Sequence, residues 1–239
     1  MKAEKYHVKR LRLMKIYAVY MDQLPEAGQF NRMMAMVSEE KRKKVGRYRY
    51  PEDASRTLIG EVLARHIISE TFHLPNEQIR FTEGRYGKPA AEGLNDFHFN
   101  ISHSGKWIVC GAGAQPIGVD VEKIKPINFD IAKRFFSPSE HDDLMEKDES
   151  ERLSYFYHLW TMKESFIKQA GKGLSLPLDS FSVKLNEQGR ASVETPPGYP
   201  PCYIQAYEID PGYKMAVCSA APEFPGRIVM KSCAELSML

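Results

Sequence analysis

The chain has few cysteines, and no two of them have the spacing of a metal or redox motif. Cys110, Cys202, Cys218 and Cys233 are too far apart for a CxxC pattern. Three of them lie in apolar stretches with the pattern of strands. We therefore expect small, buried, reduced side chains, as in a cytoplasmic protein.

Long hydrophobic runs are also missing. No stretch approaches the ~18–20 apolar residues that a membrane-spanning helix needs, so we expect no membrane partner. The first residues, MKAEKYHVKRLRL, are basic but lack the apolar centre of a signal peptide. Because a strand pattern begins at Met14, we expect residues 1–13 to be an extension outside the fold.

An excess of charge of one sign is absent as well. The chain has 33 basic and 31 acidic side chains, a formal net charge of +2. A nucleic-acid-binding protein of this size usually has a clear basic excess, so we expect no nucleic-acid partner. With 239 residues, 43% of them hydrophobic, the chain can form one large domain or two small ones.

Motifs that supply a nucleophile or bind a nucleotide on a glycine-rich loop are not found. The sequence has no GxSxG elbow, no P-loop, no GxGxxG after a strand and no HExxH. These absences leave metal-assisted phosphoryl chemistry without a covalent enzyme intermediate as the candidate reaction class.

Two long segments have the periodicity of helices, at 52–72 and 150–170, and Gly171 ends the second. Each follows a strand pattern, at 14–22 and 117–124. This order predicts an α+β fold of two similar halves, each a long helix on a small antiparallel sheet. Further strands are expected at 78–83, 97–104 and 106–114, and then at 181–185, 190–195, 202–209 and 213–220.

The two halves are expected to be subdomains of residues 14–116 and 117–239. Shorter helices are expected after Ser38 and Ser137, because both serines have the sequence setting of a helix N-cap. Gly60 interrupts the first long helix and indicates that another element approaches it closely.

Two acidic residues, Asp120 and Glu122, lie two apart in the strand GVDVE. They therefore point to the same face, where two carboxylates repel unless a cation or a proton relieves them. Hard oxygen ligands at this spacing are typical of Mg²⁺ sites that also use substrate phosphates. The alternative is a pair of exposed acids without a function.

Glu164 and Lys168 are one turn apart on the second long helix. Such a pair is often a surface ion pair worth only a few tenths of a kcal/mol. This helix is rich in aromatic residues, however, which favours a functional site, and Glu164 could supply a third metal ligand.

Ser102 and His103 lie at the end of the strand FNISHS. The histidine is either a structural residue or a donor to a phosphate. Together with Lys41, Lys44 and Lys88 it would complete a polyanion site. The alternative for the lysines is an ordinary solvated surface.

Three stretches carry a family resemblance: GVDVE at 118–122, WTMKESFIK at 160–168 and FNISHS at 99–104. They resemble the signature blocks of the 4′-phosphopantetheinyl transferases, in the same order and spacing. From Met14 almost to the end, the chain is similar to the long, pseudo-dimeric Sfp type of the surfactin and gramicidin group. The resemblance implies a pseudo-twofold fold, an active site at the interface of the subdomains, and a monomer.

The resemblance also implies residue roles. Asp120, Glu122 and Glu164 are the implied ligands of Mg²⁺, with Mn²⁺ as an alternative ion, and Lys168 faces the pyrophosphate of coenzyme A. Lys88, in the loop Gly87–Pro89, is implied on the adenine side. The implied phosphate contacts are Lys41, Lys44, Thr57, Ser102 and His103.

The implied reaction moves phosphopantetheine from coenzyme A to a serine of an apo peptidyl or acyl carrier protein, releasing 3′,5′-ADP. Glu164 or a metal-bound water would take the serine proton. Antibiotic-type peptide and polyketide synthetases are the implied partners. We expect the carrier to dock on 123–136 and 171–178, because both segments flank the proposed catalytic acids in the sequence; the alternative is that their apolar residues are ordinary core. The alternatives are a metal-dependent nucleotide pyrophosphatase, which uses water as nucleophile, and a coenzyme-binding module without activity.

Overall fold

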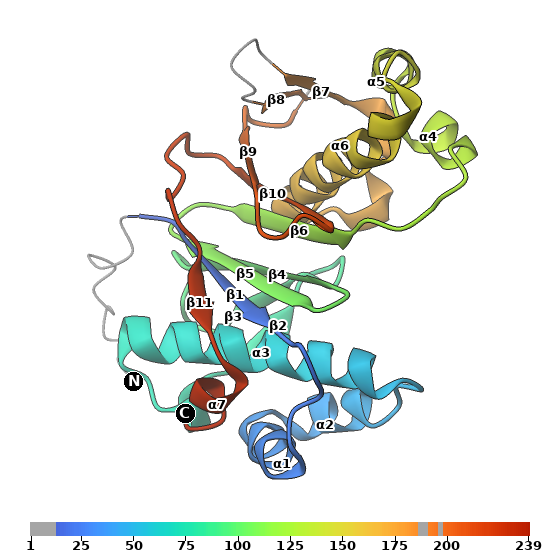
Figure 1. Cartoon of the computed structure of the whole chain (residues 1–239). Helices are drawn as coiled ribbons and strands as arrows, with labels where there is room; N and C mark the ends of the chain where they lie inside the picture. Colours follow the sequence, from blue (N-terminus) through green and yellow to red (C-terminus); the bar gives the residue numbers. More distant parts are fainter. Residues whose placement is uncertain (1–12, 186–190, 196–197) are drawn as a thin grey trace. The chain divides into compact units, whose positions relative to one another are not determined.

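The computed structural model describes residues 13–185, 191–195 and 198–239, and it divides into two compact units (Figure 1). The predicted extension at 1–13, apart from its last residue, and the predicted turn at 186–189 lie outside the described residues. Unit 1 comprises the chain up to Thr82, together with Pro89–Ala114 and Pro225–Leu239; unit 2 comprises Glu83–Lys88 and Gln115–Phe224.

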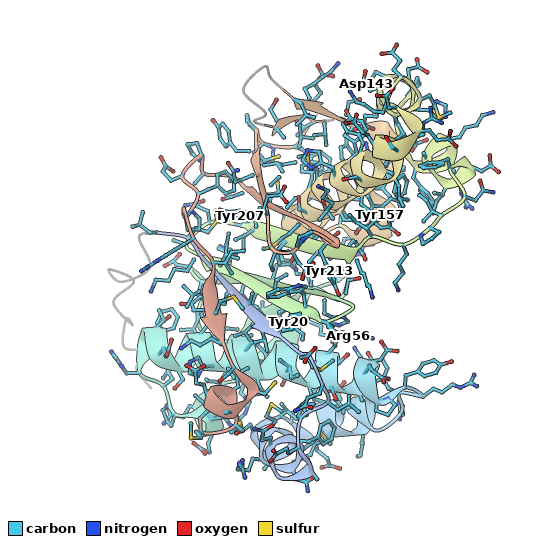
Figure 2. All side chains as sticks on the ribbon, viewed as in Figure 1. Tyr20, Arg56, Asp143, Tyr157, Tyr207 and Tyr213 are labelled. Atoms are coloured by element: carbon cyan, nitrogen blue, oxygen red, sulfur yellow. The ribbon has the colours of Figure 1, made fainter. Side chains whose placement is uncertain are left out.

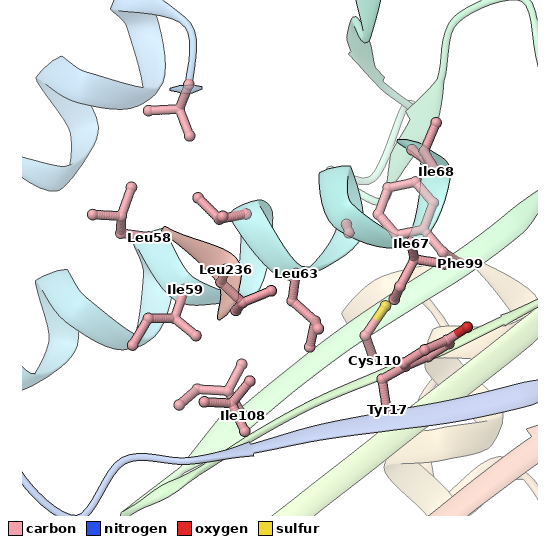
Figure 3. Close-up of a cluster of buried hydrophobic side chains, with 14 of the residues drawn as sticks. Tyr17, Leu58, Ile59, Leu63, Ile67, Ile68, Phe99, Ile108, Cys110 and Leu236 are labelled. Atoms are coloured by element: carbon pink, nitrogen blue, oxygen red, sulfur yellow. The ribbon is translucent and has the colours of Figure 1, made fainter. Parts of the chain in front are cut away.

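Unit 1 is built on a long helix, α3 (Pro51–Phe72), which packs on a four-stranded sheet of order β11-β1-β5-β4. Proline at the first position and two acids in the first turn favour the start of α3. Its buried side chains form one core with those of the sheet (Figure 3). A Cβ added to Gly60 would lie 3.0 Å from a methyl group of Ile101, which confirms the predicted close approach. The strands of this sheet are β1 (Lys15–Tyr20), β4 (His98–Ser104), β5 (Trp107–Gly113) and β11 (Val229–Lys231).

The smaller elements of unit 1 follow local signals, one of which was misread. Ser38 caps α2, accepting a hydrogen bond from the backbone N–H of Lys41 at 3.2 Å, as predicted. The strand predicted at 78–83 was wrong in its first half, because Arg65 binds the carbonyl of Ile79 and only Phe81–Glu83 pairs as β2. The remaining elements here are α1 (Ala27–Met36), α2 (Glu39–Val45), η2 (Asn76–Gln78), β3 (Pro89–Ala91) and α7 (Cys233–Leu236).

The C-terminal segment, which the sequence placed with the second half, belongs to unit 1. Its strand β11 pairs in parallel with β1, with Val229 opposite Tyr17. Lys231 then binds Glu70 of α3 at 2.9 Å. The sheet of unit 1 is therefore mixed at this edge, while its other strand pairs are antiparallel.

Unit 2 repeats the arrangement with α6 (Glu149–Ala170) on a five-stranded antiparallel sheet (Figure 1). Gly171 ends α6 with a left-handed φ of +66°, a conformation that glycine adopts without strain. Ser137 and Glu140 form the predicted capping box of α5. The α+β fold class is thus confirmed. The sheet order is β6 (Ile117–Lys123), β10 (Tyr213–Ser219), β9 (Tyr203–Tyr207), β8 (Ala191–Glu194) and β7 (Ser182–Leu185); α4 (Asp130–Phe135), α5 (Pro138–Met145), η3 (Gly173–Ser175) and η4 (Leu178–Ser180) complete the unit.

All four cysteines are free thiols; Cys110, Cys202 and Cys218 are buried, as predicted, and Cys233 is partly exposed. Within the described part of the chain, no helix combines the length and the apolar character needed to cross a membrane.

Candidate active site

Strand β6 presents the two acidic residues of the predicted metal site. Asp120 and Glu122 lie opposite Ala216 and Lys214 of β10, so both carboxylates leave the strand on the same face. Asp120 is 1% exposed, whereas Glu122 is partly exposed. A buried carboxylate must be compensated by a cation or by hydrogen bonds.

Helix α6 brings the compensating cation and a second acid. Lys168 Nζ lies 2.6 Å from Asp120 Oδ1. Glu164, one turn earlier, is partly buried, and its pKa is raised by burial and by the negative charge of Asp120, while Lys168 acts to lower it. Asp120, Glu164 and Lys168 therefore act on one another at a single place in unit 2.

These side chains suit a divalent cation that shares its ligands with a substrate. Among the residues that the structure describes, no three acidic, histidine or cysteine side chains are close enough together to enclose an ion. Mg²⁺ does not need such a cage, because it binds one or two carboxylates together with substrate phosphates and water. The repulsion between Asp120 and Glu164 is the kind of unfavourable interaction that a cation relieves.

Gly118 sets how closely β6 and α6 approach each other. A Cβ added there would lie 2.0 Å from the carbonyl oxygen of Ser165, 2.3 Å from the nitrogen of Gln169 and 2.9 Å from the carbonyl carbon of Lys168. All three atoms are backbone, so no rotamer change can relieve the contact. Only glycine allows the strand that carries Asp120 to lie this close to the turn that carries Lys168.

A buried ion pair, which the sequence did not reveal, fixes the same helix from its other side. Lys163 Nζ lies 2.5 Å from Glu140 Oε2 and donates to the carbonyl of Phe181 at 2.7 Å. Burial lowers the pKa of Lys163, although Glu140 acts to raise it. Glu140 also accepts from the N–H groups of Ser137 and Val183, both at 2.8 Å. The pair therefore joins α6 to α5 and β7.

Aromatic side chains of α6 add to this fixed setting. Tyr157, labelled in Figure 2, donates from its hydroxyl to the carbonyl of Lys125 at 3.3 Å. The ring of Phe156 stacks on that of Phe136, with centroids 5.2 Å apart. Phe136 is only 3% exposed, so it belongs to the core of unit 2.

Lys88 also lies in unit 2, in the segment Glu83–Lys88. Its ammonium group is not directed to an open surface but donates to backbone carbonyls, among them those of Ile117 and Lys168. The sequence predicted a coenzyme contact for this residue and gave no sign of these partners.

The other predicted coenzyme contacts lie in unit 1. Ser102 is buried and His103 is exposed on β4, on opposite faces as predicted. Thr57 is partly buried on α3. Its neighbour Arg56, labelled in Figure 2, donates to the carbonyl of Gly105 at 2.8 Å and pairs with Asp53. Arg56 thus holds the turn that follows Ser102 and His103, a role with no signal in the sequence.

The two predicted lysines of α2 differ in their surroundings. Lys41 Nζ lies 3.1 Å from Glu61 Oε2, and Glu61 also binds Arg65 at 3.0 Å. Lys44 is exposed. The structure therefore places one of these lysines in an ion-pair network on α3 and the other at the surface.

Comparison with known proteins gives consistent matches along the chain. Residues 116–218 match the family described as "4′-phosphopantetheinyl transferase superfamily", and residues 24–115 match "4′-phosphopantetheinyl transferase, N-terminal". The chain is 56% identical to the 4′-phosphopantetheinyl transferase Sfp of Bacillus subtilis strain 168 over 223 residues, 93% of this chain and 100% of that protein. It is 46% identical to psf-1 of Bacillus pumilus over 92% of this chain and 96% of that protein. It is 40% identical to gsp of Aneurinibacillus migulanus over 80% of this chain and 79% of that protein. Psf-1 and gsp are both named 4′-phosphopantetheinyl transferases.

Proposed function

The chain belongs to the 4′-phosphopantetheinyl transferase superfamily, and on this premise we propose that it moves the 4′-phosphopantetheine group of coenzyme A to a serine of an apo carrier protein. The interaction of Asp120, Glu164 and Lys168 at one place in unit 2 is the observation that carries the proposal. It provides an acid that could act as a base, a cation for a phosphate, and oxygen ligands for a metal ion.

The proposed reaction is a direct displacement at phosphorus. The serine oxygen forms a bond to the phosphate attached to pantetheine, and the bond from that phosphorus to the oxygen of the departing 3′,5′-ADP breaks. Glu164 takes the serine proton. The carrier supplies the nucleophile, consistent with the lack of a nucleophile motif.

Mg²⁺ is the proposed metal, with Asp120, Glu122 and Glu164 as its candidate ligands. The described structure does not bring three carboxylates together around an ion, so one or two of them would bind it together with substrate phosphates and water. When bound, the ion would neutralise charge on the pyrophosphate of coenzyme A. Lys168, one turn after Glu164 on α6, neutralises charge that develops on the leaving group. Its partner in the structure is Asp120, and Lys168 would exchange that carboxylate for a phosphate of the substrate.

The residues of unit 1 are proposed as contacts of the coenzyme phosphates. Lys44 and His103 are exposed, so both can meet an anion. Lys41 would exchange the carboxylate of Glu61 for a phosphate, which leaves Arg65 to compensate Glu61. Ser102 and Thr57 supply hydroxyl donors.

The carrier protein is proposed to dock on the segment that follows Glu122. Ile124 is partly buried and packs at the edge of a cluster in unit 2, whereas Phe136 lies inside that cluster and is not part of the docking surface. Ile124→Ala should raise the KM for the carrier and leave the KM for coenzyme A unchanged. A rise in both constants, or in neither, would contradict this assignment.

Mass spectrometry of apo carrier proteins tests the proposed function directly. Incubation of the enzyme with carrier, coenzyme A and Mg²⁺ should add the mass of one phosphopantetheine to the carrier serine. Peptidyl carriers of antibiotic synthetases are the substrates of choice, with a serine-to-alanine carrier as control. Release of 3′,5′-ADP without a carrier, and no gain in carrier mass, would indicate a hydrolase instead.

A further inference from the structure

The ammonium group of Lys88 donates all of its hydrogens to backbone carbonyls. Nζ lies 2.8 Å from the oxygen of Ile117, 2.6 Å from that of Lys168 and 3.4 Å from that of Gln169. An ammonium group has three N–H donors and no acceptor. The three carbonyls account for these donors, so none is left for a coenzyme phosphate.

Two of these carbonyls belong to the last turn of α6, where the backbone needs partners from outside the helix. The final four carbonyls of an α-helix have no intrahelical donor. The N–H of Gly171 donates to the carbonyl of Ile167, and Lys88 donates to the carbonyls of Lys168 and Gln169. A cation at this end is also favoured by the helix dipole. Lys88 therefore caps α6 from another segment of the chain.

The third carbonyl joins this cap to the start of β6. Ile117 is the first residue of β6 and precedes Gly118, where the strand meets the backbone of α6 most closely. The stem of Lys88 crosses the end of the helix, because its Cδ would be 3.6 Å from a Cβ added to Gly171. One side chain thus holds the loop 83–88, the start of β6 and the end of α6 together within unit 2.

Burying the charged ammonium group of Lys88 is unfavourable, because it removes the charge from water. Burial lowers the pKa of Lys88 to about 8, and the neighbouring Cys218 opposes the shift. Buried charges are tolerated when their hydrogen bonds are satisfied, and here backbone carbonyls satisfy them.

We propose that Lys88 is a positioning residue, which fixes the last turn of α6 against β6 and so sets where the backbone of Lys168 lies relative to Asp120. The connection is direct, because Lys88 binds the carbonyl of Lys168 while Lys168 Nζ binds Asp120 Oδ1 at 2.6 Å. The loop can still take part in coenzyme binding through its backbone, but its ammonium group acts on the enzyme itself. The catalytic part of this inference rests on the proposed transferase function.

The test compares Lys88→Met, which removes the cation but keeps a long stem, with Lys184→Met as a matched control. Lys184 is an exposed lysine of unit 2, on β7, 3.7 Å from Glu194. Amide hydrogen exchange of the peptide spanning residues 163–172 should become at least about tenfold faster in Lys88→Met, because the end of α6 loses its cap. It should not change in the control. This measurement does not depend on what reaction the protein catalyses.

Kinetics with coenzyme A and with 3′-dephospho-coenzyme A separate positioning from phosphate binding. Positioning predicts that Lys88→Met lowers kcat by about 10- to 100-fold, the usual effect of removing a support behind a metal site. The ratio of kcat/KM for the two substrates should stay as in the wild type. A rise in KM for coenzyme A alone, with an unchanged kcat, would assign Lys88 to the phosphate and overturn the proposal.

Hydrogen exchange and kcat that both match the control would also overturn it. If circular dichroism shows that Lys88→Met does not fold, the same measurements on Lys88→Arg decide. That variant keeps the charge on a planar head with a different reach, so exchange at 163–172 should be faster than in the wild type, and unchanged exchange would overturn the proposal. If the wild type transfers nothing, the exchange result still decides the structural role, while the proposed function alone fails.

Discussion

Gly118→Ala should disable the site with the addition of a single methyl group. In the structure that methyl would lie 2.0 Å from the carbonyl oxygen of Ser165, whereas ordinary van der Waals contact begins at 3.4 Å. Because the obstructing atoms belong to the backbone of α6, the helix and β6 would have to separate by about 1.4 Å, the difference between these two distances. This separation would move Lys168 and Glu164 away from Asp120.

The magnitude follows from the size of that displacement. A misplacement of about 1 Å in a catalytic arrangement costs on the order of 100-fold in rate, which corresponds to roughly 2.7 kcal/mol in the barrier. Overpacking of a buried site typically costs another 1–3 kcal/mol of folding stability, roughly. Gly118→Ala should therefore lose about 100-fold in transfer rate and a few kcal/mol in the free energy of unfolding.

The assay is transfer to an apo carrier at increasing Mg²⁺ concentrations, together with urea unfolding. Gly113→Ala is the matched control, because Gly113 also lies in a strand but an added Cβ would meet Met14 at 3.5 Å, an ordinary contact. It should keep nearly the wild-type rate. A Gly118→Ala protein with wild-type rate and Mg²⁺ dependence would refute the reasoning that close packing of β6 and α6 sets the site.

Three further predictions concern charged residues. Asp120→Asn should lower transfer by about 100-fold or more, as expected for the loss of a metal ligand and of the Lys168 partner, and EDTA should abolish transfer by the wild type; full activity in EDTA would contradict a metal enzyme. Lys163→Met leaves a buried carboxylate unpaired and should cost about 3–5 kcal/mol in urea unfolding, so a loss below about 1 kcal/mol would contradict a strong buried pair. Burial acts to raise the pKa of Glu70, but Lys231 and a nearby histidine lower it overall. The ionised carboxylate therefore stabilises the fold at pH values above its unfolded pKa, and this stabilisation is lost as the pH falls through its folded pKa. The decrease in Tm caused by Lys231→Met should accordingly be present at pH 7 and become smaller below about pH 4. A decrease in Tm that does not depend on pH would contradict the assignment of this effect to Glu70.

The long helices and the site strand could be predicted because each carries a local signal. The end of α6 follows from Gly171, which adopts a left-handed φ of +66°. The shared face of Asp120 and Glu122 follows from the two-residue period of a strand. The cap at Ser137 follows from the pattern of serine, proline and glutamate. In each case the determinant lies within about four residues of the feature, so no knowledge of distant packing is needed.

Features set by contacts between distant segments could not be predicted in the same way. Strand β11 pairs with β1 although Val229 and Tyr17 are far apart in the chain, and three residues give no periodicity. The predicted strand at 78–83 began too early because a distant guanidinium, that of Arg65, takes the carbonyl of Ile79. Helix α1 was missed because its capping box begins with a glutamate, Glu26, rather than a serine or threonine.

The lysines of the candidate site show why their chemistry depends on the fold. The head group of a lysine lies at the end of a flexible four-carbon stem, so sequence spacing places its Cα but not its partner. The structure gives Lys41 the carboxylate of Glu61, Lys168 the carboxylate of Asp120, and Lys88 three backbone carbonyls. A lysine paired with a carboxylate can exchange it for a phosphate, since one ionic contact replaces another. A lysine that caps a helix cannot leave without exposing unsatisfied carbonyls, which costs about 1–3 kcal/mol for each buried group. Lys41 and Lys168 can therefore turn to a substrate, whereas Lys88 must stay where it is.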